Sequence, residues 1–263
     1  MPAGKRASLC AGCRSDRDGK NKERLAAQGY GPEILTILHQ NFANIDQVAA
    51  EYGPFDFILA DLGVSSMQID NPEPRLFSYK YDGPLDLRLN PEAGISAAER
   101  LRTVARDELE GMLIENADEP YAKEISQAVT RALRKGKKID TTFALRDLIA
   151  EALDFLPKDE KKEAIKKSCA RTFQALRIDV NNEYEVLEAF MEKLPDALAP
   201  GGRAAILTFH SGEDRLVKKS MKGLYQIGIY SEYSKEVIRP SKEECIRNSR
   251  ASSTKMRWAI KAE

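Results

Sequence analysis

The stretch FDFILADLGVSSMQID, residues 55–70, decides the fold class of this chain. An apolar run typical of a buried strand, Phe57–Ala60, leads directly into an acidic residue and a loop of small polar residues. In open α/β sheets, ligands bind outside the carboxyl ends of the strands, so a binding site is expected at this loop. Its polar candidates are Asp61, Ser65, Ser66 and Gln68. An ordinary strand exit rich in turn-forming residues is the alternative.

Further segments combine polar and small residues in distinctive patterns. They are FSYKYDGPLDLR at 77–88, ARTFQALRIDVNN at 170–182, GGRAAILTFHSGEDR at 201–215 and, more weakly, NSRASSTKMRW at 248–258. Together with DLGVSSMQID, and in this order, they resemble the motifs of the MraW/RsmH family. Members of that family are S-adenosylmethionine-dependent methyltransferases that modify the exocyclic amine of a cytosine in bacterial 16S rRNA. The resemblance covers most of residues 41–258, and an ordered run of motifs is far more specific than a lone glycine-rich loop.

The resemblance implies an α/β fold, a Rossmann-like S-adenosylmethionine-dependent methyltransferase sheet with an inserted all-helical domain. The family opens with a strand, a D.T.G.GGHS loop that holds the methionine end of the cofactor, and a helix. Residues 1–20 match none of these, so the sheet is expected to be N-terminally incomplete. The expected parts are an unmatched leader at 1–20, a methyltransferase domain at 21–90 and 172–263, and a helical, substrate-side domain at 91–171.

The leader itself carries two features. Asp16 or Asp18, in the sequence SDRD, could stand where the family has its ribose-binding acid, but a misread or truncated start is the simpler interpretation. Cys10 and Cys13 form a single C-x-x-C pair without a second ligand pair, which is weak evidence for zinc or redox chemistry. We expect no metal site.

Composition sets broad limits. With 263 residues and 42% hydrophobic content, the chain can bury the core of one large domain or two smaller ones. Lys+Arg and Asp+Glu both total 41, so the net charge gives no signal for nucleic acid or membrane. No apolar segment approaches the ~20 residues that span a bilayer, and the first residues lack an apolar signal region. We therefore expect a cytoplasmic protein with no membrane partner, and its oligomeric state stays open.

Hydrophobic periodicity predicts the elements around these motifs. Strands are expected at Ile34–His39, Phe57–Ala60, Ala204–Phe209 and Lys255–Lys261. No strand pattern occurs between Asn90 and Arg171, where helices begin at caps such as Ser96 and either Asp140 or Thr141. A charged helix is expected at Asp159–Ser168. One long helix is expected to follow it, with an apolar stripe of Phe173, Leu176, Val180, Tyr184, Leu187 and Met191.

Two basic segments are candidates for contact with RNA. Between Pro120 and Arg177 the chain has 14 Lys and Arg against 8 Asp and Glu, an excess that could follow a phosphate backbone or simply form a solvated helical face. Near the C-terminus, Arg247, Arg250, Lys255 and Arg257 accompany Trp258. They could contact phosphates, or they could be the charges that protect a terminal edge strand from pairing.

The chemistry implied by the resemblance makes modest demands on the protein. Methyl transfer to an amine is an in-line displacement, so positioning and exclusion of water matter most. The cytosine amine is a weak nucleophile because its lone pair is delocalised, and acceptors for its protons would favour attack. Hydroxyl and carboxylate groups suit this role, and His210 should emerge at the same sheet edge as Asp61. The predicted catalytic residues are Ser65, Ser66 and His210, although a structural histidine is the commoner case.

Cofactor contacts follow from the resemblance position by position. Asp61 and Gln68 match family residues that contact the cofactor, and Phe42 matches the aromatic residue near its adenine. The alternatives are a core position for Phe42 and loop-stabilising roles for Asp61 and Gln68.

Residues 209–215, FHSGEDR, match the family motif FHS.EDR. Its residues Ser211, Glu213, Asp214 and Arg215 are expected to line the RNA side or to join the loops. Gly212 replaces a leucine of many members, which is expected to loosen the turn.

The predicted function is therefore S-adenosylmethionine-dependent methylation of a cytosine amine in 16S rRNA of the small ribosomal subunit. The alternative is a truncated or catalytically inactive family member that acts as an RNA-binding or assembly protein. Without a G.GG segment, the backbone cannot approach the cofactor in the usual way, and affinity for it could be lost.

Overall fold

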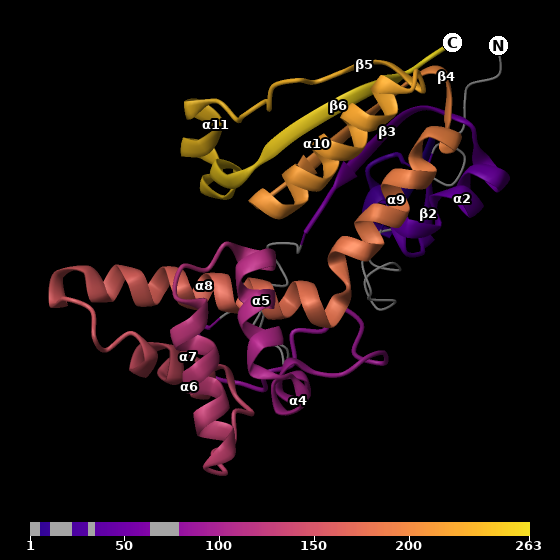
Figure 1. Ribbon diagram of the computed structural model, residues 1–263. Helices are drawn as coiled ribbons and strands as arrows, with labels where there is room; N and C mark the ends of the chain where they lie inside the picture. The colour runs from indigo at the N-terminus through magenta and orange to yellow at the C-terminus, as the bar shows by residue number, and fades with distance from the viewer. Residues whose placement is uncertain (1–5, 11–22, 31–34, 64–78) are drawn as a thin grey trace. The chain divides into compact units, whose positions relative to one another are not determined.

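The structure is a computed structural model that describes residues 6–10, 23–30, 35–63 and 79–263 (Figure 1). The chain divides into two compact units. The first, here called the sheet unit, comprises Met1–Gly63 and Tyr184–Glu263. The second, the helical unit, comprises Val64–Glu183. The mixed α/β class predicted from the sequence is confirmed.

The sheet unit contains a four-stranded sheet in the order β3-β4-β6-β5. Its strands are β3 (Phe55–Asp61), β4 (Leu198–Thr208), β6 (Lys255–Lys261) and β5 (Tyr230–Tyr233). β3 and β4 run parallel, whereas β6 runs antiparallel to both β4 and β5. A separate parallel pair is formed by β1 (Arg6–Cys10) and β2 (Leu35–His39). The strands predicted before Gln40 and at the C-terminus are thus confirmed, and β4 begins earlier than expected.

Several helices belong to this unit. They are the short helix η1 (Phe42–Asn44), α2 (Ile45–Tyr52), α9 (Glu183–Ala197), α10 (Ser211–Gln226), α11 (Lys242–Arg247) and η2 (Ser249–Ser253). Of these, α2, α9 and α10 contribute residues to its buried core. Phe190 of α9, Ile206 of β4 and Met221 of α10 meet in one buried cluster. Their burial fixes the chain on both sides of the β4–α10 loop, which carries the FHS.EDR motif.

β3 differs from the expected buried strand. The strand is present, but Phe57 is 58% exposed and Leu59 is 56% exposed. Within the described ranges β3 lies at the edge of its sheet and pairs only with β4. The prediction of burial was wrong because a continuous apolar run normally belongs to a strand covered on both faces. Here alternate side chains of β3 are not covered.

The helical unit is built from α4 (Ala97–Thr103), α5 (Arg106–Ala117), α6 (Ala122–Arg134), α7 (Thr142–Ala152) and α8 (Lys158–Asn181). The predicted capping box is present, since the Ser96 hydroxyl accepts from the Glu99 N–H and the Glu99 carboxylate accepts from Ser96. Thr141 caps α7, accepting from the Ala144 N–H at 3.2 Å. Leu113, Ile149 and Leu176 lie in the fully buried core of this unit.

The helices around Asn182 were predicted incorrectly. Lys158–Asn181 is one continuous helix, so the charged segment and the start of the apolar stripe belong together. The stripe then breaks at Asn182, which has a left-handed backbone with φ of 49° and ends α8. Asparagine tolerates this conformation better than most residues, which makes it a common helix terminator. In the described part of the chain, no helix combines the length and the apolarity needed to cross a membrane.

Candidate functional site

Asp61 and His210 follow the carboxyl ends of neighbouring parallel strands, as predicted. Asp61 is the last residue of β3 and lies opposite Leu207 of β4. The pairing continues one residue further, because the Leu62 N–H donates to the Leu207 carbonyl at 3.1 Å. β4 ends at Thr208, and His210 is the N-cap residue of α10. Both residues therefore belong to the sheet edge at which α/β proteins bind ligands.

The Asp61 side chain is available at this edge. The residue is exposed, and the structure gives its carboxylate no hydrogen-bond or ion-pair partner among the residues it describes. Partial desolvation raises the pKa of the carboxyl above its ordinary value. A carboxylate at a strand end can accept hydrogen bonds from a ligand. The loop-stabilising alternative concerns contacts with residues 64–78, which lie outside the described residues.

His210 caps a helix. Its Nδ1 accepts from the Glu213 N–H at 3.4 Å, which in the neutral ring places the proton on Nε2. Nε2 lies 3.2 Å from Glu213 Oε1 and forms an ion pair when His210 is protonated. The buried Glu213 also accepts from the Phe209 N–H at 2.9 Å. This reciprocal arrangement resembles a capping box and gives His210 a structural role at the site edge.

Phe42 lies in η1, shortly after β2 ends. Its ring meets the Phe190 ring edge-on, with centroids 5.3 Å apart and planes at 79°. Phe42 is only partly buried and packs against the core of the sheet unit. These contacts agree with the core alternative and leave part of the side chain exposed.

The other predicted site residues, Ser65, Ser66 and Gln68, lie outside the described residues, as do Cys13, Asp16 and Asp18.

Arg257 is not part of an RNA-facing stripe. It is 4% exposed, and its guanidinium forms a two-point ion pair with Asp214, with distances of 2.7 and 3.2 Å. It also donates to the Ser234 carbonyl at 3.3 Å. The edge-strand alternative was wrong as well, because β6 lies between β4 and β5. Arg257 instead joins β6 to α10, so Asp214 of the FHS.EDR motif serves to link these elements.

Two motifs of the helical unit, GPLDLR at 83–88 and ARTFQALRIDVNN at 170–182, are joined by hydrogen bonds of Asn181. Asn181 accepts from the Leu89 N–H at 2.7 Å and donates to the Leu87 carbonyl at 2.8 Å. Leu87 is buried and has a positive φ of 63°. Asn181 thereby ties the GPLDLR segment to α8. Sequence reasoning did not find this contact, because its partners lie more than 90 residues apart and only the folded helix brings them together.

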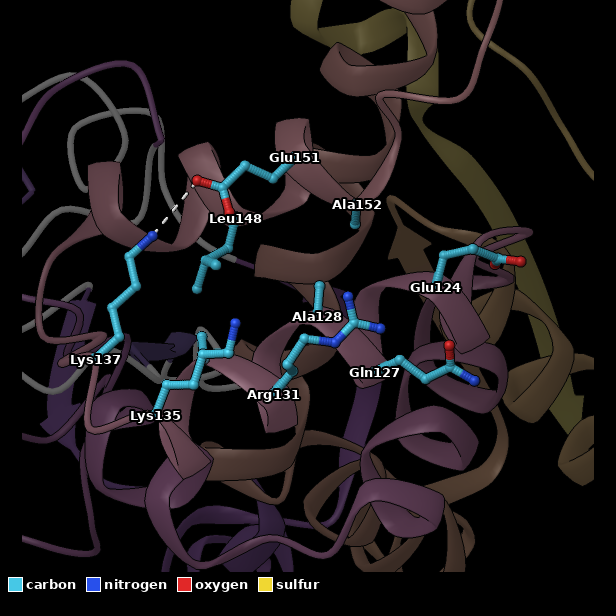
Figure 2. Close-up of a pocket in the computed structure, with 10 residues that line it drawn as sticks. Glu124, Gln127, Ala128, Arg131, Lys135, Lys137, Leu148, Glu151 and Ala152 are labelled. Carbon is cyan, nitrogen blue, oxygen red and sulfur yellow. Dashed lines mark hydrogen bonds and ion pairs between the residues drawn. The ribbon is translucent and has the colours of Figure 1, made fainter.

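A groove opens between α6 and α7 of the helical unit, with a volume of about 430 Å³ (Figure 2). Its lining residues are Glu124, Gln127, Ala128, Arg131, Ala132, Lys135, Lys137, Leu148, Glu151 and Ala152. Its three cations, Arg131, Lys135 and Lys137, belong to the basic segment between Pro120 and Arg177 noted in the sequence. Arg134 and Lys138 of the same segment do not line the groove.

β3 and β4 are parallel strands that end in polar residues, which is the arrangement at which α/β proteins bind ligands. Residues 11–262 match the MraW methylase family, and the chain belongs to that family. The predicted family and the predicted enzyme class, a methyltransferase, are confirmed by this match and by the relatives below.

Several curated relatives are similar over nearly the whole chain. Ribosomal RNA small subunit methyltransferase H 1 of Agathobacter rectalis is 68% identical over 93% of this chain and 70% of its own length. The protein of the same name from Lachnoclostridium phytofermentans is 70% identical over 92% of this chain and 66% of its own length. Ribosomal RNA small subunit methyltransferase H 2 of Alkaliphilus metalliredigens is 61% identical over 92% of this chain and 69% of its length. The chain thus spans about two thirds of the length of these relatives.

Proposed function

We propose that this protein transfers a methyl group from S-adenosylmethionine to the exocyclic amine of a cytosine in 16S rRNA of the small ribosomal subunit. The observation that carries the proposal is the family match over residues 11–262, together with relatives named as methyltransferases of small-subunit ribosomal RNA. These names favour an enzyme over the alternative of a non-catalytic RNA-binding or assembly protein.

The proposed division of labour follows the two-part chain. Residues 21–90 and 172–263 form the methyltransferase domain, and residues 91–171 form an inserted helical domain on the substrate side. The run of helices α4 to α8 without a described strand among them supports a helical insertion. The compact helical unit is wider than the proposed domain, since it comprises Val64–Glu183 and α8 continues to Asn181. The polar edge at the ends of β3 and β4 supports a cofactor site in the sheet unit.

The available residues fit such a cofactor. Asp61 offers an exposed carboxylate without a described partner, suited to the hydroxyl or ammonium donors of S-adenosylmethionine. Phe42, which is partly exposed, is the proposed neighbour of the adenine, and Gln68 is the third proposed contact. When bound, the cofactor supplies an electrophilic methyl group on a sulfonium.

The protein's own contribution is proposed to be orientation and proton acceptance. The hydroxyls of Ser65 and Ser66 accept hydrogen bonds from the cytosine amine and direct its lone pair toward the methyl group. His210 completes the edge, and its capping bonds hold its ring in one orientation beside the start of α10. The amine loses its proton to solvent or to a neighbouring acceptor after transfer, so a strong base is not required.

Calorimetry with S-adenosylmethionine tests the cofactor site. Replacing Asp61 with alanine should weaken binding about tenfold or more, because a hydrogen bond to a charged group contributes about 1.5–3 kcal/mol. Asp56 of the same strand is also exposed, and Asp56→Ala is the matched control. Equal affinity of the Asp61 variant and the control would remove Asp61 from the site.

A further inference from the structure

The groove between α6 and α7 has two kinds of wall. Part of its lining is apolar and is here called the floor; it is formed by Leu148 and by three alanines, Ala128, Ala132 and Ala152. Leu148 is 3% exposed, so the floor is continuous with the core of the helical unit. The small alanine side chains leave the space between the two helices unfilled. The result is a hollow of about 430 Å³, within the range of small-ligand sites.

Cations surround one end of this hollow. Arg131 and Lys135 have no hydrogen-bond or ion-pair partner within the described ranges of the chain. Lys137 forms an ion pair with Glu151, with 3.5 Å between Nζ and Oε1. Figure 2 shows these two side chains pointing toward each other. The lining has these three cations and two carboxylates, those of Glu124 and Glu151, so its net charge is +1. A net positive lining favours an anionic ligand.

The size and lining of the hollow narrow the ligand further. A phosphate group alone would leave most of the apolar floor uncovered, whereas a nucleobase has a flat apolar face that suits it. Glu124 and Gln127 line the groove as well and offer donors and acceptors for a base edge. Unpaired RNA presents this combination, a phosphate linked to a base that is free to leave its stack.

We infer that the α6–α7 groove binds one unpaired nucleotide of the RNA substrate, with its phosphate on Arg131 and Lys135 and its base on the apolar floor. The inference rests on the proposed function, because it takes RNA as the substrate. The inference adds an RNA contact in the helical unit to the proposed function. It assigns phosphate binding to Arg131 and Lys135, which line the groove, and none to Arg134 and Lys138, which lie outside it.

Binding of a short fluorescent single-stranded RNA, measured by anisotropy over a range of salt, tests the inference. The variant Arg131→Gln/Lys135→Gln removes two charges from the groove. Arg134→Gln/Lys138→Gln removes the same charge from the neighbouring exposed surface and is the matched control. The groove variant should weaken binding about tenfold or more, and its slope of log affinity against log salt should fall by about 1.4, the value for two lost phosphate contacts on a single strand. The control should change affinity less than about threefold.

A second pair of variants tests the floor without changing charge. Ala152→Phe fills the groove, whereas Ala170→Phe adds the same bulk at an exposed position of α8 outside it. Only Ala152→Phe should weaken RNA binding, and the salt slope should stay that of the parent chain. Circular dichroism melts show whether each variant is folded.

The outcomes separate the groove from the enzyme activity. Equal loss for both charge pairs, together with no effect of Ala152→Phe, would overturn the inference and identify a solvated basic face. Groove-specific loss in a chain that transfers no methyl group would support the groove and count against the proposed activity. Methyl transfer with unchanged RNA binding in the groove variants would support the activity and reject the groove.

Discussion

Gly212 lies so close to Tyr184 that a methyl group in place of its hydrogen would overlap the Tyr184 hydroxyl and come within 2.7 Å of the ring carbon Cζ. Gly212 is in the first turn of α10, and Tyr184 is in the first turn of α9. The Tyr184 ring also lies 6.0 Å from the His210 ring. The glycine therefore makes room for a tyrosine that packs beside the candidate site. This contact was not expected from the sequence, which suggested only a looser turn.

The first prediction is that positions 184 and 212 are energetically coupled. Gly212→Ala should destabilise the chain by about 1–3 kcal/mol, because overpacking at a tight contact forces the neighbours apart. In a Tyr184→Ala background the same change should cost little. Urea unfolding of the two single variants and the double variant measures this, and the coupling should be about 0.5–3 kcal/mol. Additive effects would show that the two residues do not share this space.

Arg257 provides the second prediction. Arg257→Gln leaves the largely buried Asp214 carboxylate without its partner. The free energy of unfolding should therefore fall by about 3–5 kcal/mol. RNA affinity of the folded variant should stay unchanged, because Arg257 faces Asp214 and not solvent. Lys255→Gln, on the same strand, is the control and should change stability by less than about 0.5 kcal/mol. Weaker RNA binding by a fully stable Arg257 variant would restore the phosphate-contact interpretation.

The third prediction uses the raised pKa of Asp61. Because desolvation raises this pKa above its ordinary value of 3.8, the folded chain binds the proton more tightly than the unfolded chain does. The contribution of Asp61 to stability therefore falls as the pH rises from 3.8 through the raised pKa, and it stays unfavourable at neutral pH. Asp61→Asn should be at least as stable as the parent at neutral pH, with the difference vanishing in acid.

Thermal melts across this pH range measure the effect, which should be small because Asp61 is exposed. If Asp61 binds the cofactor, the Asp61→Asn protein should be more stable than the parent and should bind the cofactor more weakly. A variant that melts lower at neutral pH would instead assign Asp61 to the support of its own loop.

Local signals in the sequence predicted much of the fold. The Ser96 box and the Thr141 cap require only neighbouring residues, and both are present. β6 is likewise a short run with strong strand preference. β5 was not predicted, because Tyr230–Tyr233 is only four residues long and is defined by its pairing with β6. The break at Asn182 was missed because the apolar stripe continues through it in register.

In the candidate site, too, some features could be predicted from local sequence and others depend on the folded structure. The common edge of Asp61 and His210 follows from two parallel strands that each end in polar residues, a pattern visible in the sequence. The pairing of Asp214 with Arg257 spans 43 residues and depends on β6 lying inside the sheet, which no local pattern indicates. The α6–α7 groove depends on alanines that look like ordinary core positions until two helices meet across them.

The most direct test of the central claim is the identity of the nucleoside formed. Small ribosomal subunits from cells lacking this methylation are incubated with the protein and S-adenosylmethionine carrying an isotopically labelled methyl group. The 16S rRNA is then digested and analysed by mass spectrometry. We expect labelled cytidine methylated on its exocyclic amine, formed only when both the protein and the cofactor are present. Binding of the subunits by folded protein without any labelled cytidine would contradict the proposed methyl transfer and favour a non-catalytic RNA-binding role.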